Sequence, residues 1–148
     1  LGADVFVSIH LNAARDRRVA GIETYVIPAA GFLSTASPRA TPGGAERTVY
    51  AGNNFDAANV ILAYLLHQGL LVHSQSADRG IRRARFQVLK TAPCPAALVE
   101  CGFLSNRREA ERLAEEDYRD QLAEGMARGL LTYVSRVREA RLSMLAEK

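Results

Sequence analysis

The predicted fold follows from one heptapeptide, VFVSIHL at residues 5–11. It is apolar and largely β-branched, which is typical of a strand buried on both faces of a sheet. A second run of this kind is AALVEC at residues 96–101. Each run has one ionisable side chain near its carboxyl end, His10 in the first and Glu100 in the second. We therefore expect two interior strands that each end close to an ionisable residue.

Two shorter strands are predicted at residues 21–27 and 86–89. Residues 28–55 are rich in proline and glycine and predict a long loop insertion, which suits a lid or a docking loop. The segment at residues 78–90 is basic, and Gly80 is expected to form a turn within it.

Three helices are predicted after the long loop. Asp56 is expected to cap the first helix, whose residues 57–66 are apolar on nearly every side. Asn106 is expected to cap the second, with Glu109 three residues later in a capping-box arrangement. The third helix should begin near Asp117. Strands that alternate with helices indicate an α/β fold, with a mostly parallel sheet flanked by helices.

Length and composition indicate a single domain. The chain has 148 residues, 48% hydrophobic and 24% charged, which is the balance of a globular protein. Because the chain has no initiator Met and little sequence precedes the first strand, we expect it to be part of a longer protein. Residues 138–148 are expected to form a charged, frayed tail. No signal peptide is visible, and no apolar run approaches the roughly 20 residues of a membrane span.

His10 and Glu100 are the two candidate active-site residues. The carboxyl ends of parallel strands usually border the ligand crevice of an open α/β sheet, so the two side chains should converge there. A carboxylate in so apolar a run is also costly to bury without a partner. Spacing alone leaves two interpretations open, a functional pair and two unrelated structural residues. His67 and His73, in and after the first helix, are interpreted as packed or partly exposed imidazoles.

Four motifs extend this interpretation: SIHLNA at 8–13, GIETY at 21–25, DRGI at 78–81 and VECGFLSN at 99–106. In this order they closely resemble the zinc-dependent N-acetylmuramoyl-L-alanine amidases, the amidase type 3 family, over residues 3 to about 137. The first and last motifs together are specific, whereas GIETY alone is weak. The resemblance implies that residues 1–137 are the C-terminal portion of the family's catalytic domain and lack the first strands and helices of the full domain.

The resemblance also implies an activity and roles for single residues. It implies a peptidoglycan hydrolase that uses zinc to cleave the amide between N-acetylmuramic acid and L-alanine of the stem peptide. His10 matches the family's second metal-binding histidine, and Glu100 matches the glutamate that acts in catalysis. Asn12 and Arg79 are the candidate substrate-binding residues. The family's other two zinc ligands, a histidine in a GHGG-type motif and a glutamate, are expected upstream of Leu1 because this chain has no such motif.

The chain alone is therefore expected to bind zinc weakly and to hydrolyse nothing, since a catalytic zinc needs three protein ligands and a water. Glu23 or His73 would have to replace the missing ligands. The whole protein is expected in the periplasm or cell envelope, with peptidoglycan as its partner. An activator protein of unknown identity is a further candidate partner.

The charge of the chain does not select one functional class. A net charge of +3 and a pI near 9.1 suit an anionic polymer such as cell wall or nucleic acid without selecting either, and an ordinary solvated surface fits them at least as well. The basic residues at 79–90 would face either stem-peptide carboxylates or solvent. Only Phe86 is interleaved with them, which disfavours nucleic-acid binding.

Three other functions stay open from the sequence: a thiol hydrolase, a non-catalytic peptidoglycan-binding or regulatory module, and a basic nucleic-acid binder. The thiol hydrolase would use Cys94 or Cys101 with His10. Cys101 follows Glu100 directly, so its side chain should point to the opposite face of the sheet. Cys94 lies between two prolines, with no helix N-terminus to lower its pKa.

Overall fold

A four-stranded sheet forms the centre of the protein, seen in a computed structural model that describes residues 2–35 and 47–146. The strands are β1 (Phe6–Asn12), β2 (Ile22–Val26), β3 (Asp78–Arg83) and β4 (Ala96–Phe103). The helices are the 3-10 turn η1 (Ala51–Phe55), α1 (Asp56–Ser74), α2 (Gln87–Lys90), α3 (Arg107–Ala114) and α4 (Glu116–Ala146).

The sheet has the strand order β1-β4-β2-β3. β1 pairs with β4 and β2 pairs with β3 in parallel, whereas β2 and β4 are antiparallel. The predicted α/β class with flanking helices is confirmed, and the sheet is mixed, with two of its three pairings parallel. Because β1 and β4 are parallel, their carboxyl ends lie at the same edge of the sheet.

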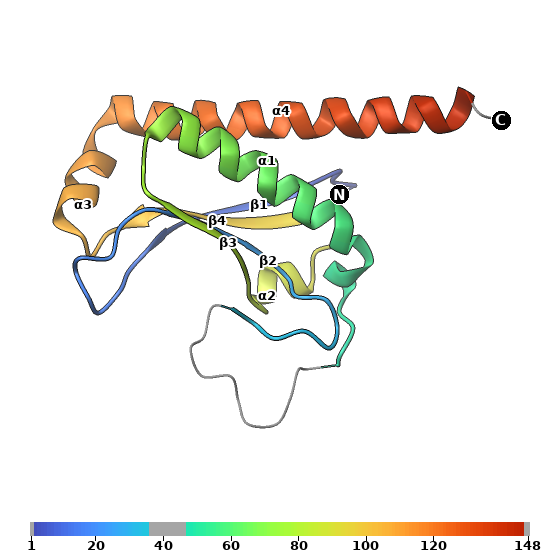
Figure 1. Cartoon of the computed structure of the whole chain (residues 1–148), viewed down its shortest axis with the longest axis horizontal. Coiled ribbons are helices and arrows are strands. Elements are labelled where there is room, and N and C mark those ends of the chain that lie inside the picture. Colours follow the sequence, from blue (N-terminus) through green and yellow to red (C-terminus); the bar gives the residue numbers. More distant parts are fainter. Residues whose placement is uncertain (1, 36–46, 147–148) are drawn as a thin grey trace.

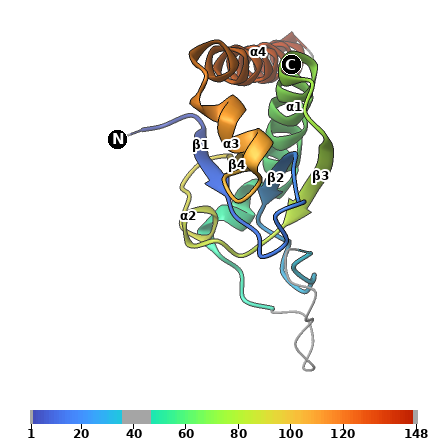
Figure 2. The same cartoon turned by 90° about the vertical axis from the view of Figure 1, so that its left-hand side faces the viewer.

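Helices α1 and α4 cover one face of the sheet. Figures 1 and 2 show α1 against the strands and the long helix α4 lying beyond it. The main core between these layers includes Ile22 of β2, Leu62 and Leu66 of α1, Val99 of β4 and Tyr118 of α4. Removal of this apolar surface from water is the main force that holds the layers together.

A smaller cluster lies on the opposite face of the sheet, next to α2. It contains Tyr25, Leu89, Ala96 and Leu98. Successive side chains of a strand alternate between the two faces, so Glu100 shares this second face with Ala96 and Leu98. Glu100 therefore lies on the face that α1 and α4 leave uncovered.

Glycines allow α1 and α4 to pack at very short range. A Cβ atom on Gly69 of α1 would lie 2.2 Å from the carbonyl oxygen of Gly125 in α4. A Cβ atom on Gly129 would lie 2.5 Å from the carbonyl oxygen of Leu65. Only residues without a side chain let the two backbones approach this closely.

Strand β1 is not the doubly buried strand that its composition predicts. It lies at the edge of the sheet, where the side chains of Ile9 and Leu11 are 59% and 46% exposed. Within the described part of the chain, β1 pairs with β4 alone. An apolar β-branched run favours a strand, but its burial depends on which other elements cover it.

Residues 78–90 adopt a different order of elements from the predicted one. Asp78–Arg83 form β3, where a turn at Gly80 is predicted, and Gln87–Lys90 form the short helix α2, where a strand is predicted. Gly80 has a φ of +82°, a conformation that glycine adopts without a steric cost. The fully buried Leu89 accounts for the apolar pattern, because one helical turn buries it as well as a strand would.

Helix α1 is longer than predicted. It begins at Asp56, which is its first residue rather than its cap, and it continues to Ser74. His67 and His73 therefore both lie within the helix. Gln75 ends it in a left-handed conformation with a φ of 51°.

The predicted cap of α3 is confirmed in part. The side chain of Asn106 accepts hydrogen bonds from the backbone N–H groups of Arg108 and Glu109. Glu109 does not complete a capping box, because its carboxylate accepts hydrogen bonds from the backbone of Gly21 (2.8 Å) and Phe103 (2.7 Å). Glu109 thus ties α3 to the ends of two strands.

Helix α4 begins next to the predicted position and continues far beyond the predicted end. It runs to Ala146, so residues 138–146 are helical rather than frayed. Figure 1 shows this end of α4 extending past the rest of the protein. Of the predicted loop at 28–55, residues 51–55 form η1, and residues 36–46 lie outside the described part of the chain.

One helical segment, Ala51–Ser74, is long and apolar enough to cross a membrane by length and composition alone, which the sequence-based expectation overlooked. In the fold, α1 packs against the sheet and α4, and it contributes Leu62, Ala63, Leu66 and Leu70 to the main core. This placement is that of a core helix.

Candidate active site

Three ionisable side chains form a row across β1, β4 and β2. In the strand register, His10 of β1 lies opposite Glu100 of β4, and Glu100 lies opposite Glu23 of β2. Residues that are opposite in register point to the same face of a sheet. The structure thus brings the predicted pair His10 and Glu100 together on the face of the sheet opposite to α1 and α4. Glu23 lies beside them on the same face.

Glu100 has an unusual environment for a carboxylate. Its side chain is half-buried, and its Oε2 atom has no hydrogen-bond partner among the described residues. Burial raises the pKa of Glu100 above its ordinary value; the charge of His10 opposes this shift, and the like charge of Glu23 adds to it. Each of the two protonation states of a carboxyl group has a use in acid–base chemistry, and this shift favours the protonated state of Glu100.

His10 is accessible to a ligand. Its side chain is exposed, and its Nε2 forms a hydrogen bond of 2.8 Å with the hydroxyl of Ser8, two residues earlier on the same face. Imidazole is a common metal ligand in proteins, and its second ring nitrogen is often held by a hydrogen bond.

Glu23 was considered from the sequence only as a substitute metal ligand, and its position beside Glu100 was missed. It is only 3% exposed, and it accepts hydrogen bonds from Arg79 Nε (2.8 Å) and from the hydroxyl of Tyr25. Arg82 lies 3.3 Å from the same carboxylate. The glutamate in GIETY, the arginine within DRGI and the arginine directly after it were the available signals, but only the pairing of β2 with β3 brings them together.

Asn12 and Arg79, the two predicted substrate-binding residues, both lie next to this buried carboxylate. The side-chain amide of Asn12 donates to Glu23 over 3.4 Å, and Arg79 forms the ion pair described above. Burial, and the hydrogen bond to Glu23, raise the pKa of the Tyr25 phenol. These contacts hold Glu23 in place beside Glu100, and a role of Asn12 and Arg79 in substrate binding stays a prediction.

The other two histidines have structural partners. His67 is buried and contacts Thr24 through Nδ1 and Asp78 through Nε2, each at 2.9 Å. His73 uses Nδ1 to contact the carbonyl oxygen of Gly69 at 2.9 Å. The interpretation of both as packed or partly exposed imidazoles is confirmed.

The residues present do not make a complete zinc site. Within residues 2–35 and 47–146, no three histidine, cysteine, aspartate or glutamate side chains converge as metal ligands. His10 offers one donor. Glu23 and His73, the two expected substitutes, are bound to arginines and to a backbone carbonyl instead.

The cysteines do not fit a thiol hydrolase. Cys94 and Cys101 are both buried. Burial raises the pKa of the Cys101 thiol to about 12 and also raises that of Cys94. Cys101 belongs to the main core under α1, on the opposite face from Glu100. A nucleophilic thiol needs a lowered pKa and access to substrate, and neither cysteine has these.

Comparison with known proteins gives a consistent result. The profile of a family described as N-acetylmuramoyl-L-alanine amidase matches residues 1–132. The chain is 32% identical over 129 residues to N-acetylmuramoyl-L-alanine amidase CwlM of Bacillus licheniformis. The aligned region covers 87% of this chain and 40% of that protein.

Solved structures agree in fold. The N-acetylmuramoyl-L-alanine amidase of Clostridium difficile 630 superposes with a TM-score of 0.68 at 34% identity, covering 90% of this chain and 59% of that one. The CwlD amidase of Clostridioides difficile, solved in complex with the GerS lipoprotein, gives a TM-score of 0.67 at 25% identity, with coverages of 90% and 56%. The chain thus spans about half the length of the proteins that it matches.

Proposed function

The chain belongs to the N-acetylmuramoyl-L-alanine amidase family, and on that premise we propose that it carries the proton-transferring part of a peptidoglycan hydrolase. The reaction is hydrolysis of the amide between N-acetylmuramic acid and L-alanine of the stem peptide. The observation that carries this proposal is the row of His10, Glu100 and Glu23, in which Glu100 has a raised pKa and an unpartnered oxygen.

Glu100 is the proposed catalytic residue. As a carboxylate it accepts a proton from the attacking water, and as a carboxylic acid it gives that proton to the departing amine. Half-burial and the neighbouring Glu23 favour the protonated form, which supports the second role. Asn12 and Arg79 hold Glu23 in place and are proposed to contact substrate from the same side of the sheet.

His10 is the proposed contribution of this chain to a zinc site. Because the described residues provide no set of three donors, zinc binding depends on further ligands from protein outside them. The exposed edge of β1 supports this proposal, since no strand other than β4 among residues 2–35 and 47–146 pairs with it and its exposed Ile9 and Leu11 suit a neighbouring strand. We accordingly regard residues 1–137 as the C-terminal portion of a catalytic domain, with the rest of α4 following it.

The proposed location is the cell envelope, in the periplasm where the cell has one, because peptidoglycan is found there. An activator protein is a further proposed partner. It is supported by one related amidase, CwlD, whose structure was solved in complex with a lipoprotein.

The bond that is cleaved tests the proposal. The full-length protein that contains this chain is incubated with purified sacculi, and new amino termini are identified by dinitrophenylation. We expect L-alanine as the only new amino-terminal residue, with no new reducing sugar ends. New reducing ends, or another amino-terminal residue, would contradict the proposed reaction.

A non-catalytic peptidoglycan-binding module is the second candidate function. It is favoured by the absence of three converging metal ligands within the described residues. Sedimentation of the protein with insoluble peptidoglycan, compared with dye release from labelled sacculi, separates the two functions. Binding without release by the full-length protein would favour the module.

A further inference from the structure

A groove with three arginines borders the candidate active site. It has a volume of about 660 Å³ and is lined by Ala14, Arg15, Arg17, Leu104, Ser105 and Arg107. The first three residues belong to the loop after β1, Leu104 and Ser105 belong to the connection between β4 and α3, and Arg107 is the first residue of α3. The groove is therefore built from the two segments that directly follow His10 and Glu100.

Hydrogen bonds hold the two walls of the groove together. The backbone N–H of Ala14 donates to the hydroxyl of Ser105 over 2.9 Å, and the side-chain amide of Asn106 donates to the carbonyl oxygen of Arg17 over 3.1 Å. The backbone N–H of Leu104 donates to the carbonyl oxygen of Asn12 over 2.8 Å. These cross-links give the arginines a fixed backbone on both sides.

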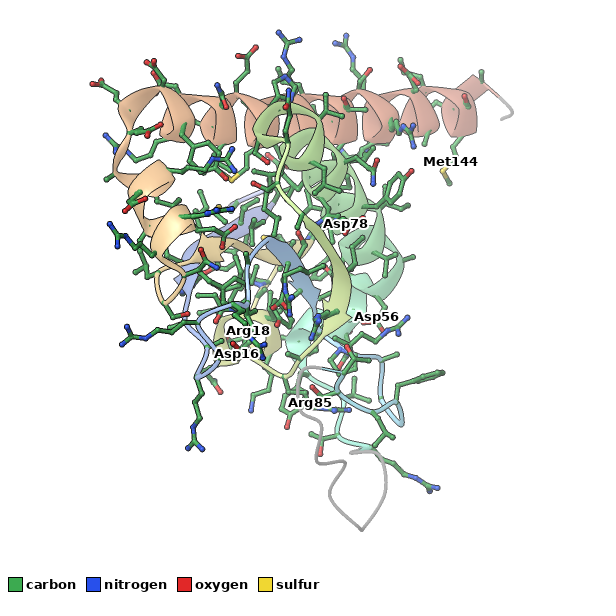
Figure 3. All side chains as sticks on the ribbon, turned by 60° about the vertical axis from the view of Figure 1, so that its left-hand side comes forward. Asp16, Arg18, Asp56, Asp78, Arg85 and Met144 are labelled. Carbon is green, nitrogen blue, oxygen red and sulfur yellow. The ribbon has the colours of Figure 1, made fainter. Side chains whose placement is uncertain are left out.

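The groove is positively charged and its charge is largely uncompensated. Arg15 and Arg17 are exposed and form no ion pair within the part of the chain that the structure describes. The nearby carboxylate of Asp16 is held by Arg18 at 2.8 Å (Figure 3). Arg107 pairs with Glu111 on the solvent side. Guanidinium groups bind carboxylates in a planar, bidentate geometry, so a carboxylate is the ligand that best suits these arginines.

The groove is also within reach of the proposed reaction centre. Ala14 lies four residues after His10, and Leu104 lies four residues after Glu100. Four residues of chain span at most roughly 14 Å, and an extended tripeptide spans roughly 10 Å. A short peptide with its amide at Glu100 can therefore place its carboxylates between the arginines.

Resting on the proposed amidase function, we propose that Arg15 and Arg17 bind the free carboxylates of the stem peptide. The ligand class is a short peptide with carboxylate side groups, such as the α-carboxylate of a γ-linked D-glutamate. The predicted basic segment at 79–90 is a weaker candidate, because two of its arginines, Arg79 and Arg82, are bound to Glu23.

The test is a calorimetric titration of the 148-residue chain at low ionic strength, which preserves electrostatic attraction. The probe is N-acetyl-L-alanyl-γ-D-glutamyl-L-lysine, compared with the same peptide carrying amides in place of both carboxylates. The variant is Arg15→Gln with Arg17→Gln. The matched control is Arg136→Gln with Arg138→Gln, which removes the same charge from an exposed part of α4.

We expect the groove variant to bind the carboxylate peptide at least about tenfold more weakly, whereas the α4 control binds it as the unchanged chain does. The diamide peptide should bind weakly to all three proteins. Equal affinity of the groove variant and the control, equal binding of both peptides, or no binding of the carboxylate peptide would overturn the proposal. Tighter binding of a poly(glycerol phosphate) than of the peptide would overturn the assignment to carboxylates.

This result is independent of catalysis, because the titration requires neither zinc nor turnover. The two proposals can fail separately. If the groove variant loses peptide binding but the full-length protein leaves sacculi intact, the hydrolase function is refuted and the carboxylate-binding role of the groove is supported. Hydrolysis by a full-length groove variant that no longer distinguishes free-acid from amidated stem peptides would support both.

Discussion

At the scale of single residues, Glu23 is the best example of a role that depends on contacts distant in sequence. Its carboxylate is buried, and Arg79, which binds it, lies 56 residues further along the chain. The energetic cost of burying a carboxylate is offset only if such partners are present. The sequence contains both residues, but only the pairing of β2 with β3 makes them neighbours.

Replacing Arg79 by methionine keeps an unbranched apolar side chain and removes the guanidinium group with its charge. Because Glu23 then loses its shortest ion pair while staying buried, we expect Arg79→Met to lower the free energy of unfolding by about 1–3 kcal/mol. Urea unfolding at pH 7 measures this effect. Arg83→Met is the matched control on the same strand, because Arg83 is exposed, and equal losses for both variants would contradict the account.

The thiols offer a test by pH. Because burial raises the pKa of Cys101 to about 12, the thiolate is absent from the folded chain at pH 8, whereas in the unfolded chain, with a pKa near the ordinary 9.0, a measurable fraction is present. We expect iodoacetamide to leave Cys101 unmodified in the folded chain and to modify it in urea, as seen by mass spectrometry. Rapid labelling of Cys101 under folding conditions would show that the core around β4 is open.

At the scale of elements, the sequence was sufficient to predict those helices and strands whose local residue pattern matches the structure that they adopt. The strands at β1, β2 and β4 and the helix that follows Asn106 were all predicted. The exposure of β1 was not predicted, because the burial of a strand depends on the elements that pack against it and not on its composition alone. Residues 86–89 were misassigned for a related reason, since a short apolar run fits one buried helical turn as well as a strand.

The contact between α1 and α4 yields a prediction at this scale. A Cβ atom on Gly69 would lie 2.2 Å from a backbone oxygen of α4, and backbone cannot move aside as a side chain can. We expect Gly69→Ala to lower the free energy of unfolding by about 1–3 kcal/mol. Thermal unfolding checks it, with Gly2→Ala as the control, because a Cβ atom on Gly2 meets no other atom within 4 Å. Unchanged stability of Gly69→Ala would mean that the two helices are further apart.

At the scale of the whole molecule, the proposed active site needs metal ligands that the described residues do not provide. His10 and Glu100 were predicted from their positions at the ends of two apolar runs, and the structure brings them together. The complete metal site cannot be derived from these residues, because the described part provides one suitable histidine and no set of three ligands.

The 148-residue chain alone is therefore predicted to bind zinc weakly. A single histidine with a water-exposed side chain cannot exclude competing water ligands. Calorimetric titration with zinc should show no tight site, and His10→Ala should change the titration little. One-to-one binding with a sub-micromolar dissociation constant would contradict the prediction.

The most direct test of the account concerns Glu100 in the full-length protein. Glu100→Gln keeps the size and polarity of the side chain but removes its ability to carry a proton, so the measured quantities are kcat for muramoyl-peptide hydrolysis and the zinc content of the same sample. If Glu100 transfers the proton, we expect kcat to fall by about 10²–10⁴-fold while zinc content and fold stay unchanged. A variant that retains near wild-type kcat with its zinc bound would contradict the assignment of Glu100 as the proton-transferring residue.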